Sequence, residues 1–202
     1  MTNSNKNLPT VQGVGIVGYG QYSPFLGKTM TKHYRKWISM LERSHSVSYK
    51  QDNIEYVDVT CVPEWHLFQT FAEWCDVQIG FNNEGWHLDK DILVKGNKIY
   101  GPDFCAFVPA ELNSLLNTRS RARSDSGTVG VLRTKYGRFT ASCKMGGSHA
   151  VYLGTYSTIE EAFLVYKETK EQYIKQRAFY WKDQIDERVY HALMNRTVDV
   201  DD

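Results

Sequence analysis

The chain has 202 residues, a length that fits one medium domain or two small ones. Its composition, with 42% hydrophobic and 23% charged residues, allows a buried core and so excludes an intrinsically disordered protein. No run approaches the roughly 20 apolar residues of a membrane span, and the start, MTNSNKNLPT, lacks the apolar core of a signal peptide. A soluble cytoplasmic protein without a membrane partner is therefore expected.

Two short helices are predicted between residues 30 and 75. Apolar residues recur at helical spacing in MTKHYRKWISMLERSHS and again in EWHLFQTFAEWCD. Pro63 stands near the start of the second helix, where proline is well tolerated. Both apolar faces are rich in aromatic residues, such as Trp37 and Phe68, which predicts a small aromatic core.

A β-hairpin followed by a helix is predicted from GWHLDKDILVKGNKIYGPDFCAFVPAELNSLL. His87, Asp89 and Asp91 fall on one face of the first strand, because alternate side chains of a strand share a face. A turn at 95–97, a second strand through 104–108 and a helix that opens near Pro109 complete the layout. Three ionisable groups on one face indicate a catalytic site, with a structural or degenerate remnant as the alternative.

This ββα layout resembles the HNH nuclease motif of phage homing endonucleases. The resemblance runs from GVGIVG at residue 13 through YRKWISMLER, EWHLFQTFAEW and LDKDILVKGNKIY to FVPAELNSL. It implies one divalent metal ion, Mg²⁺ or Mn²⁺, held by Asp89 of the first strand and Asn113 of the helix, while Asn97 fixes the loop. The catalytic residues it implies are His87, Asp89, Lys90, Asp91, Asn97 and Asn113.

The sequence departs from this family at several positions. Lys90 stands where the family has its general-base histidine, so that water activation would fall to His87, Asp91 or Lys90 itself. Phe104 stands where many related sequences have Asn. Related sequences often carry Cys in the segments that match ERSHS and TCVPEW, but here Ser44 replaces one and Cys61 is displaced by one position, so no zinc site is predicted. The four cysteines, at 61, 75, 105 and 143, are expected to be reduced thiols.

A basic linker is predicted at residues 117–128, NTRSRARSDSGT, which are polar and lack apolar anchors. The net charge of the chain is only +1, but positive residues are concentrated from this linker to residue 144. That stretch holds Arg119, Arg121, Arg123, Arg133, Lys135, Arg138 and Lys144 against the single acid Asp125, an excess of six positive charges. The concentration favours contact with phosphates, and a solvated spacer is the alternative for the linker.

Three antiparallel strands and a covering helix are predicted for residues 129–182. Turn signals occur at TKYG and MGGS, and a helix starts with Ser157 or Thr158 as its N-cap. In the middle strand the two faces differ: Phe139, Ala141, Cys143 and Met145 on one, Arg138, Thr140, Ser142 and Lys144 on the other. The helix must cover the apolar face, which leaves an open, basic face. Residues 183–202 form an extension whose acidic end, TVDVDD, is expected to fray.

This second pattern resembles the AP2 DNA-binding domain of plant transcription factors and phage homing endonucleases, over GVLRTKYGRFTASCK, VYLGTYST and EEAFLVYK. The resemblance implies a sheet in the major groove of double-stranded DNA. It places Lys144 at a base-contacting position, Tyr136 and Tyr152 at the positions of contacting Trp residues, and Lys135 and Arg138 near phosphate. Base specificity is not implied, because several family contact positions differ: Val129, Leu132, Thr134, Ser142 and Ala150.

Together these patterns predict an α+β protein with an HNH-like nuclease domain at 1–116, a basic linker at 117–128, an AP2-like DNA-binding domain at 129–182 and an extension at 183–202. The expected function is that of a metal-dependent DNA endonuclease or nickase in the cytoplasm, a host cytoplasm if the chain is phage-encoded. The alternative is a protein that keeps the architecture without cutting and acts as a DNA-binding factor or an inhibitor of a host protein. The missing histidine at Lys90 supports this alternative.

Overall fold

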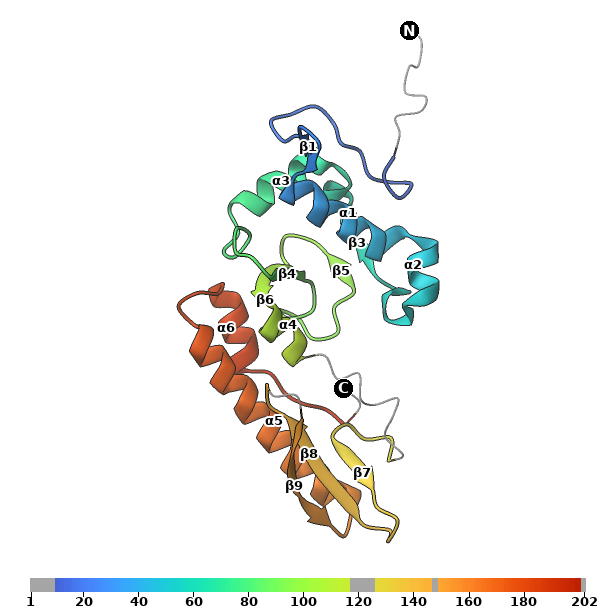
Figure 1. Cartoon of the computed structure of the whole chain (residues 1–202), viewed down its shortest axis with the longest axis vertical. Helices are drawn as coiled ribbons and strands as arrows, with labels where there is room; N and C mark the ends of the chain where they lie inside the picture. Colours follow the sequence, from blue (N-terminus) through green and yellow to red (C-terminus); the bar gives the residue numbers. More distant parts are fainter. Residues whose placement is uncertain (1–9, 117–125, 147–148, 201–202) are drawn as a thin grey trace. The chain divides into compact units, whose positions relative to one another are not determined.

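The structure is a computed structural model that describes residues 10–116, 126–146 and 149–200. It has the expected mixed α+β composition, with helices and several small sheets (Figure 1). The chain divides into two compact units, Met1–Phe107 and Val108–Asp202. The expected linker at 117–128 lies largely outside the described residues, so that boundary stays a prediction. Within the described ranges, no helix is both long enough and apolar enough to cross a bilayer.

The two helices predicted for the first unit are present. They are α1, Lys32–His45, which Thr31 caps by accepting a hydrogen bond from the backbone of Tyr34, and α3, Phe68–Asp76. The sequence did not predict α2, Val47–Asp52, or the 3₁₀ helix η1, Ile54–Tyr56. Pro63 opens the 3₁₀ helix η2, Pro63–His66, directly before α3.

The core of the first unit is aromatic, as predicted. Trp37, Trp65, Phe68 and Phe71 are almost completely buried. The indole of Trp37 donates a hydrogen bond of 2.7 Å to the carbonyl of Trp65, so its polar atom has a partner inside the core. The Trp65 and Phe71 rings meet edge to face with centroids 5.1 Å apart. This packing joins α1, η2 and α3.

The strands of the first unit are short. They pair as β1, Phe25–Leu26, with β2, Thr29–Met30, and as β3, Thr60–Cys61, in parallel with β5, Ile99–Tyr100. The strand predicted from 86 onwards is β4, Trp86–Asp89, and its partner is β6, Ala106–Pro109, which begins two residues later than predicted. Trp86 and Leu88 are buried while His87 is exposed, so β4 alternates as a half-buried strand does.

The second unit contains the predicted three-stranded antiparallel sheet. Its strands are β7, Val131–Arg133, β8, Phe139–Lys144, and β9, Ala150–Tyr156, in the order β7-β8-β9. Helix α5, Ile159–Trp181, lies along the sheet (Figure 1), and the alternate residues Ala141 and Cys143 of β8 are buried. Thr158 caps α5 in a reciprocal capping box with Glu161, which confirms the predicted start of the helix.

Close packing between β7 and α5 depends on a glycine. Gly130 has a φ of +71°, and a Cβ at this position would lie 2.1 Å from the Tyr166 ring. Lys170, one turn further along α5, is buried, and its Nζ donates a hydrogen bond of 2.8 Å to the carbonyl of Leu115 in α4, Ala110–Leu115. The short helix α4 is thereby joined to α5 within the second unit.

The C-terminal extension is more ordered than predicted. It forms a further helix, α6, Glu187–Met194, that packs on α5 and buries Val189 and Leu193. The expectation of a frayed end is wrong as far as Val198, whose side chain is buried. The carbonyl of Val198 accepts a hydrogen bond of 2.7 Å from Lys167, and its backbone N–H donates one of 2.9 Å to Glu171. The buried side chain of Val198 and the hydrogen bonds of its backbone thus both hold this end of the chain.

Candidate functional site

The end of β4 is shaped by the carboxylate of Asp89. Its Oδ1 accepts hydrogen bonds from the backbone N–H groups of Asp91, at 2.9 Å, and Ile92, at 2.7 Å. Such a side-chain to backbone turn ends the extended segment at Asp89. Asp91 therefore lies in the bend after the strand, and the prediction that His87, Asp89 and Asp91 share one strand face is wrong for Asp91.

Asn97 holds the loop that follows β4. Its amide nitrogen donates to the carbonyls of Lys90, at 2.6 Å, and Ile99, at 2.8 Å, and its oxygen accepts from the backbone of Ile99, at 3.3 Å. These are the contacts that a loop-fixing Asn requires, since the side chain bridges the two ends of the loop. The loop is thus held closed beside Asp89.

Lys90 faces inward rather than toward solvent. The residue is only 9% exposed, and its ammonium lies 3.5 Å from Oδ2 of Asp91. This contact gives the Lys90 nitrogen a carboxylate partner inside the protein. Of the three water-activating groups that the sequence left open, Lys90 is thus the poorest candidate, because its nitrogen is already engaged by Asp91.

The electrostatic setting differs between Asp89 and His87. Burial, together with the neighbouring Asp91 carboxylate, raises the pKa of Asp89 to about 6. Burial also lowers the pKa of His87, and the positive charges of Lys36 and Arg43 lower it further. An exposed imidazole with a lowered pKa is neutral near pH 7 and can accept a proton.

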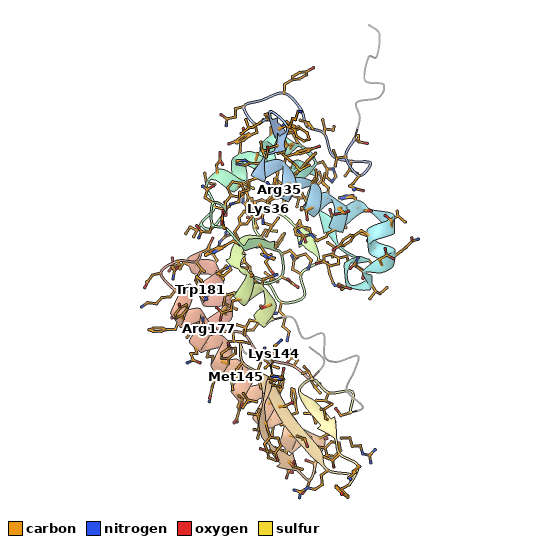
Figure 2. The ribbon with its side chains drawn as sticks, viewed as in Figure 1. Arg35, Lys36, Lys144, Met145, Arg177 and Trp181 are labelled. Atoms are coloured by element: carbon orange, nitrogen blue, oxygen red, sulfur yellow. The ribbon has the colours of Figure 1, made fainter. Side chains whose placement is uncertain are left out.

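Two cations of α1 at this site were missed in the sequence. Lys36 and Arg43 are seven residues apart, which places them on one face of the helix. Lys36 donates a hydrogen bond of 2.7 Å to the carbonyl of Trp86 in β4, and Figure 2 labels it next to Arg35 on α1. Arg43 donates to the carbonyl of Ser39 at 3.1 Å. The helical spacing was visible in the sequence, but nothing local indicated that this face meets β4.

The two predicted metal ligands belong to different units. Asp89 ends β4 in the first unit, and Asn113 lies on α4 in the second unit. Joint coordination of a metal ion by this pair therefore stays a prediction. Within the first unit, Asp91 is the acidic side chain that accompanies Asp89.

In the second unit, the pairing of the strands determines which side chains lie on the face of the sheet opposite α5. Tyr152 pairs with Ser142, Ala150 with Lys144, and Thr155 with Thr140. Tyr152 is 65% exposed, and its hydroxyl lies 3.0 Å from the hydroxyl of Thr155. Lys144, at the end of β8 in Figure 2, is exposed as predicted. This open face is largely neutral and polar. Among the described residues of the paired strands, Lys144 is the cation that lies on it.

Other residues that were predicted to contact DNA lie at or next to the β7–β8 turn. Tyr136 is 80% exposed there, and the ammonium of Lys135 lies 4.9 Å from the centre of its ring. Arg138 donates a hydrogen bond of 3.2 Å to the carbonyl of Thr155. Arg133 pairs with Phe139, so the alternation of the strand directs it to the face that carries α5. Arg119, Arg121 and Arg123 lie outside the described residues.

Comparison of the chain with models of protein families, with curated proteins and with solved structures finds no match.

Proposed function

We propose that the chain is a metal-dependent DNA endonuclease or nickase of the HNH type, whose second unit binds duplex DNA as an AP2-like domain. One observation carries the proposal. An exposed imidazole with a lowered pKa, His87, stands on the same strand as Asp89, whose carboxylate lies beside that of Asp91. A base and a pair of carboxylates are the groups that metal-assisted hydrolysis of a phosphodiester needs.

The donor set suits a hard cation. Burial raises the pKa of Asp89, and repulsion from the Asp91 carboxylate raises it further; a bound cation would offset both effects. Mg²⁺ or Mn²⁺ prefers such oxygen ligands, and Asp89 would be the ligand that the first unit supplies. When bound, the ion would neutralise charge on the phosphate and on the leaving oxygen.

The residues of the chain would share the remaining work. His87 would accept a proton from water while the water oxygen attacks phosphorus and the bond from phosphorus to the 3′ oxygen breaks. Asn97 would keep the loop closed, and Lys36 would add positive charge next to the attacked phosphate. On the second unit, Lys144 and Tyr152 would contact bases, while Lys135, Tyr136 and Arg138 would follow the backbone.

The test is nicking of supercoiled plasmid and of phage genomic DNA in Mg²⁺ or Mn²⁺. His87→Ala and Asp89→Ala are expected to abolish nicking, whereas His191→Ala and Asp103→Ala, which change exposed residues of the same types, are expected to retain it. Absence of nicking by the unmodified chain, with DNA binding intact in a gel-shift assay, would exclude the nuclease.

A second function is favoured by the position of Lys90. This residue is buried against Asp91 where the family has its base, an arrangement compatible with a chain that binds DNA or a host protein without cutting. Lys90→His separates the two cases. A nuclease that relies on His87 would change its rate only modestly, whereas a degenerate site would remain inactive or regain cutting through the restored histidine.

A further inference from the structure

Three potential metal ligands meet in the first unit, away from the β4 loop. They are His45 at the end of α1, Cys61 in β3 and His66 at the end of η2. One ligand atom from each lies within 4.8 Å of the other two. The residues are separated by 15 and 4 intervening positions in the sequence, so the fold, rather than a local motif, brings them together.

His66 has an unsatisfied nitrogen at this place. Among the described residues, its Nε2 is a buried atom with no hydrogen-bond partner. A buried polar group without a partner lowers stability, so such an atom is rare in a native protein unless something binds it. The backbone of His66 is fixed independently, because its carbonyl accepts a hydrogen bond of 2.8 Å from Ile16.

His45 is oriented by Ser44. The Ser44 hydroxyl lies 2.8 Å from the carbonyl of Met40 and 2.8 Å from Nδ1 of His45. If the hydroxyl gives its one proton to the Met40 carbonyl, its oxygen can accept a hydrogen bond from Nδ1 of His45, and in that tautomer the lone pair is on Nε2. A ligating histidine is held in this way when its other nitrogen donates to a neighbouring oxygen.

The third ligand, Cys61, is buried and close to both rings. Its thiol donates to the carbonyl of Val62 at 3.3 Å. The rings of His45 and His66 stand nearly perpendicular, at 82°, with centroids 5.1 Å apart. Two nitrogens and one sulfur thus converge from three elements.

We propose that His45, Cys61 and His66 form a zinc site, with water at the fourth position. Imidazole and thiolate are ligands for Zn²⁺, whereas Mg²⁺ and Mn²⁺ prefer oxygen. The ion is thus distinct from the one proposed for Asp89. Its role is structural: it ties the end of α1 to β3 and η2, which are only two and four residues long.

The first measurement is the metal content of the untagged, full-length chain after zinc loading and dialysis. About one zinc per chain is expected, with loss of most of it in Cys61→Ser and in His66→Gln. His191→Gln and Cys143→Ser remove an exposed histidine and a thiol of the second unit, and both are expected to retain the zinc. If Cys61→Ser does not fold, His66→Gln decides, because it changes an atom that has no partner in the metal-free chain.

Cobalt replacement gives an independent readout. The cobalt-loaded chain is expected to show a thiolate-to-cobalt charge-transfer band that Cys61→Ser abolishes and His66→Gln weakens. Zinc should raise the melting temperature of the unmodified chain but leave that of both variants unchanged. Less than about a tenth of an equivalent of zinc with no cobalt band, or equal zinc in the unmodified chain and both variants, would overturn the proposal.

Discussion

Asp89 illustrates how single residues of the site differ from residues that only stabilise the fold. Its pKa is raised to about 6, so the ionised side chain is costly at neutral pH. A folded-state pKa above the unfolded one gives stability that is fully present at low pH and is lost as the pH rises through about 6. The carboxylate thus destabilises the chain near pH 7, as expected for a group retained for binding or catalysis.

Asp89→Asn is therefore expected to stabilise the metal-free protein. The amide oxygen can still accept the hydrogen bonds from Asp91 and Ile92, while the buried charge is removed. We expect the free energy of unfolding to rise by about 1 to 2 kcal/mol near pH 8 and to change little near pH 4, where Asp89 is protonated. Urea unfolding at the two pH values measures this. A loss of stability near pH 8 would contradict it.

Lys36 is expected to set the pH dependence of cutting. Its positive charge helps to lower the pKa of His87, so Lys36→Ala should raise that pKa. If neutral His87 is the base, the acidic limb of the pH profile for nicking will move to higher pH, in addition to any fall in rate. Arg35→Ala removes the same charge from the adjacent, exposed position of α1 and should leave the limb in place. If the acidic limb of the pH profile moves equally in both variants, His87 is not the base.

At the scale of elements, α5 shows which features a sequence fixes locally. Thr158 and Glu161 form a capping box whose hydrogen bonds are 3.2 Å each, from the Glu161 N–H to the Thr158 hydroxyl and from the Thr158 N–H to the Glu161 carboxylate. Thr158→Ala is expected to cost about 1 kcal/mol of stability, because the Glu161 N–H in the first turn of the helix loses its partner, the Thr158 hydroxyl. Ser157→Ala, one residue earlier, should cost little. Thermal unfolding followed by circular dichroism compares the two, and equal costs would contradict the assignment of the cap.

Other elements depend on contacts that no local pattern reveals. Strand β8 could be predicted, since Ala141 and Cys143 alternate with polar residues along it. The two-residue strands β3 and β5 could not, because they are too short for any periodicity. Lys170 is a charged residue on the buried face of α5, which the sequence predicted to be apolar. Its burial is possible because its ammonium donates a hydrogen bond to the carbonyl of Leu115, a residue distant in sequence.

The candidate sites divide in the same way. His87 and Asp89 share a strand face, which alternation predicts, whereas the turn made by the Asp89 side chain moves Asp91 off that face. The group formed by His45, Cys61 and His66 has no regular spacing, and the sequence predicted no zinc site there. Sequence patterns thus found residues that act within one element and missed those that act between elements.

For the whole molecule, the proposed function separates binding from cutting between the two units. The net charge is only +1, so the chain as a whole has little attraction for DNA. Attraction would come from the local basic residues of the second unit, and binding there would raise the effective concentration of DNA at the first unit. Binding and chemistry should then respond to different substitutions.

Lys144→Ala is accordingly expected to weaken DNA binding without slowing the chemical step. If Lys144 contacts a base, the loss should be about 1 to 3 kcal/mol at one salt concentration; if it contacts a phosphate, the slope of log affinity against log salt should fall by about 1. Lys175→Ala removes the same charge from an exposed position of α5 and should change neither the affinity nor the salt slope.

Single-turnover nicking at saturating protein separates binding from chemistry. Lys144→Ala should match the unmodified rate, whereas His87→Ala should bind normally and cut slowly. A Lys144→Ala chain that binds normally, or one that stays slow at saturation, would show that the two units do not divide the work in this way.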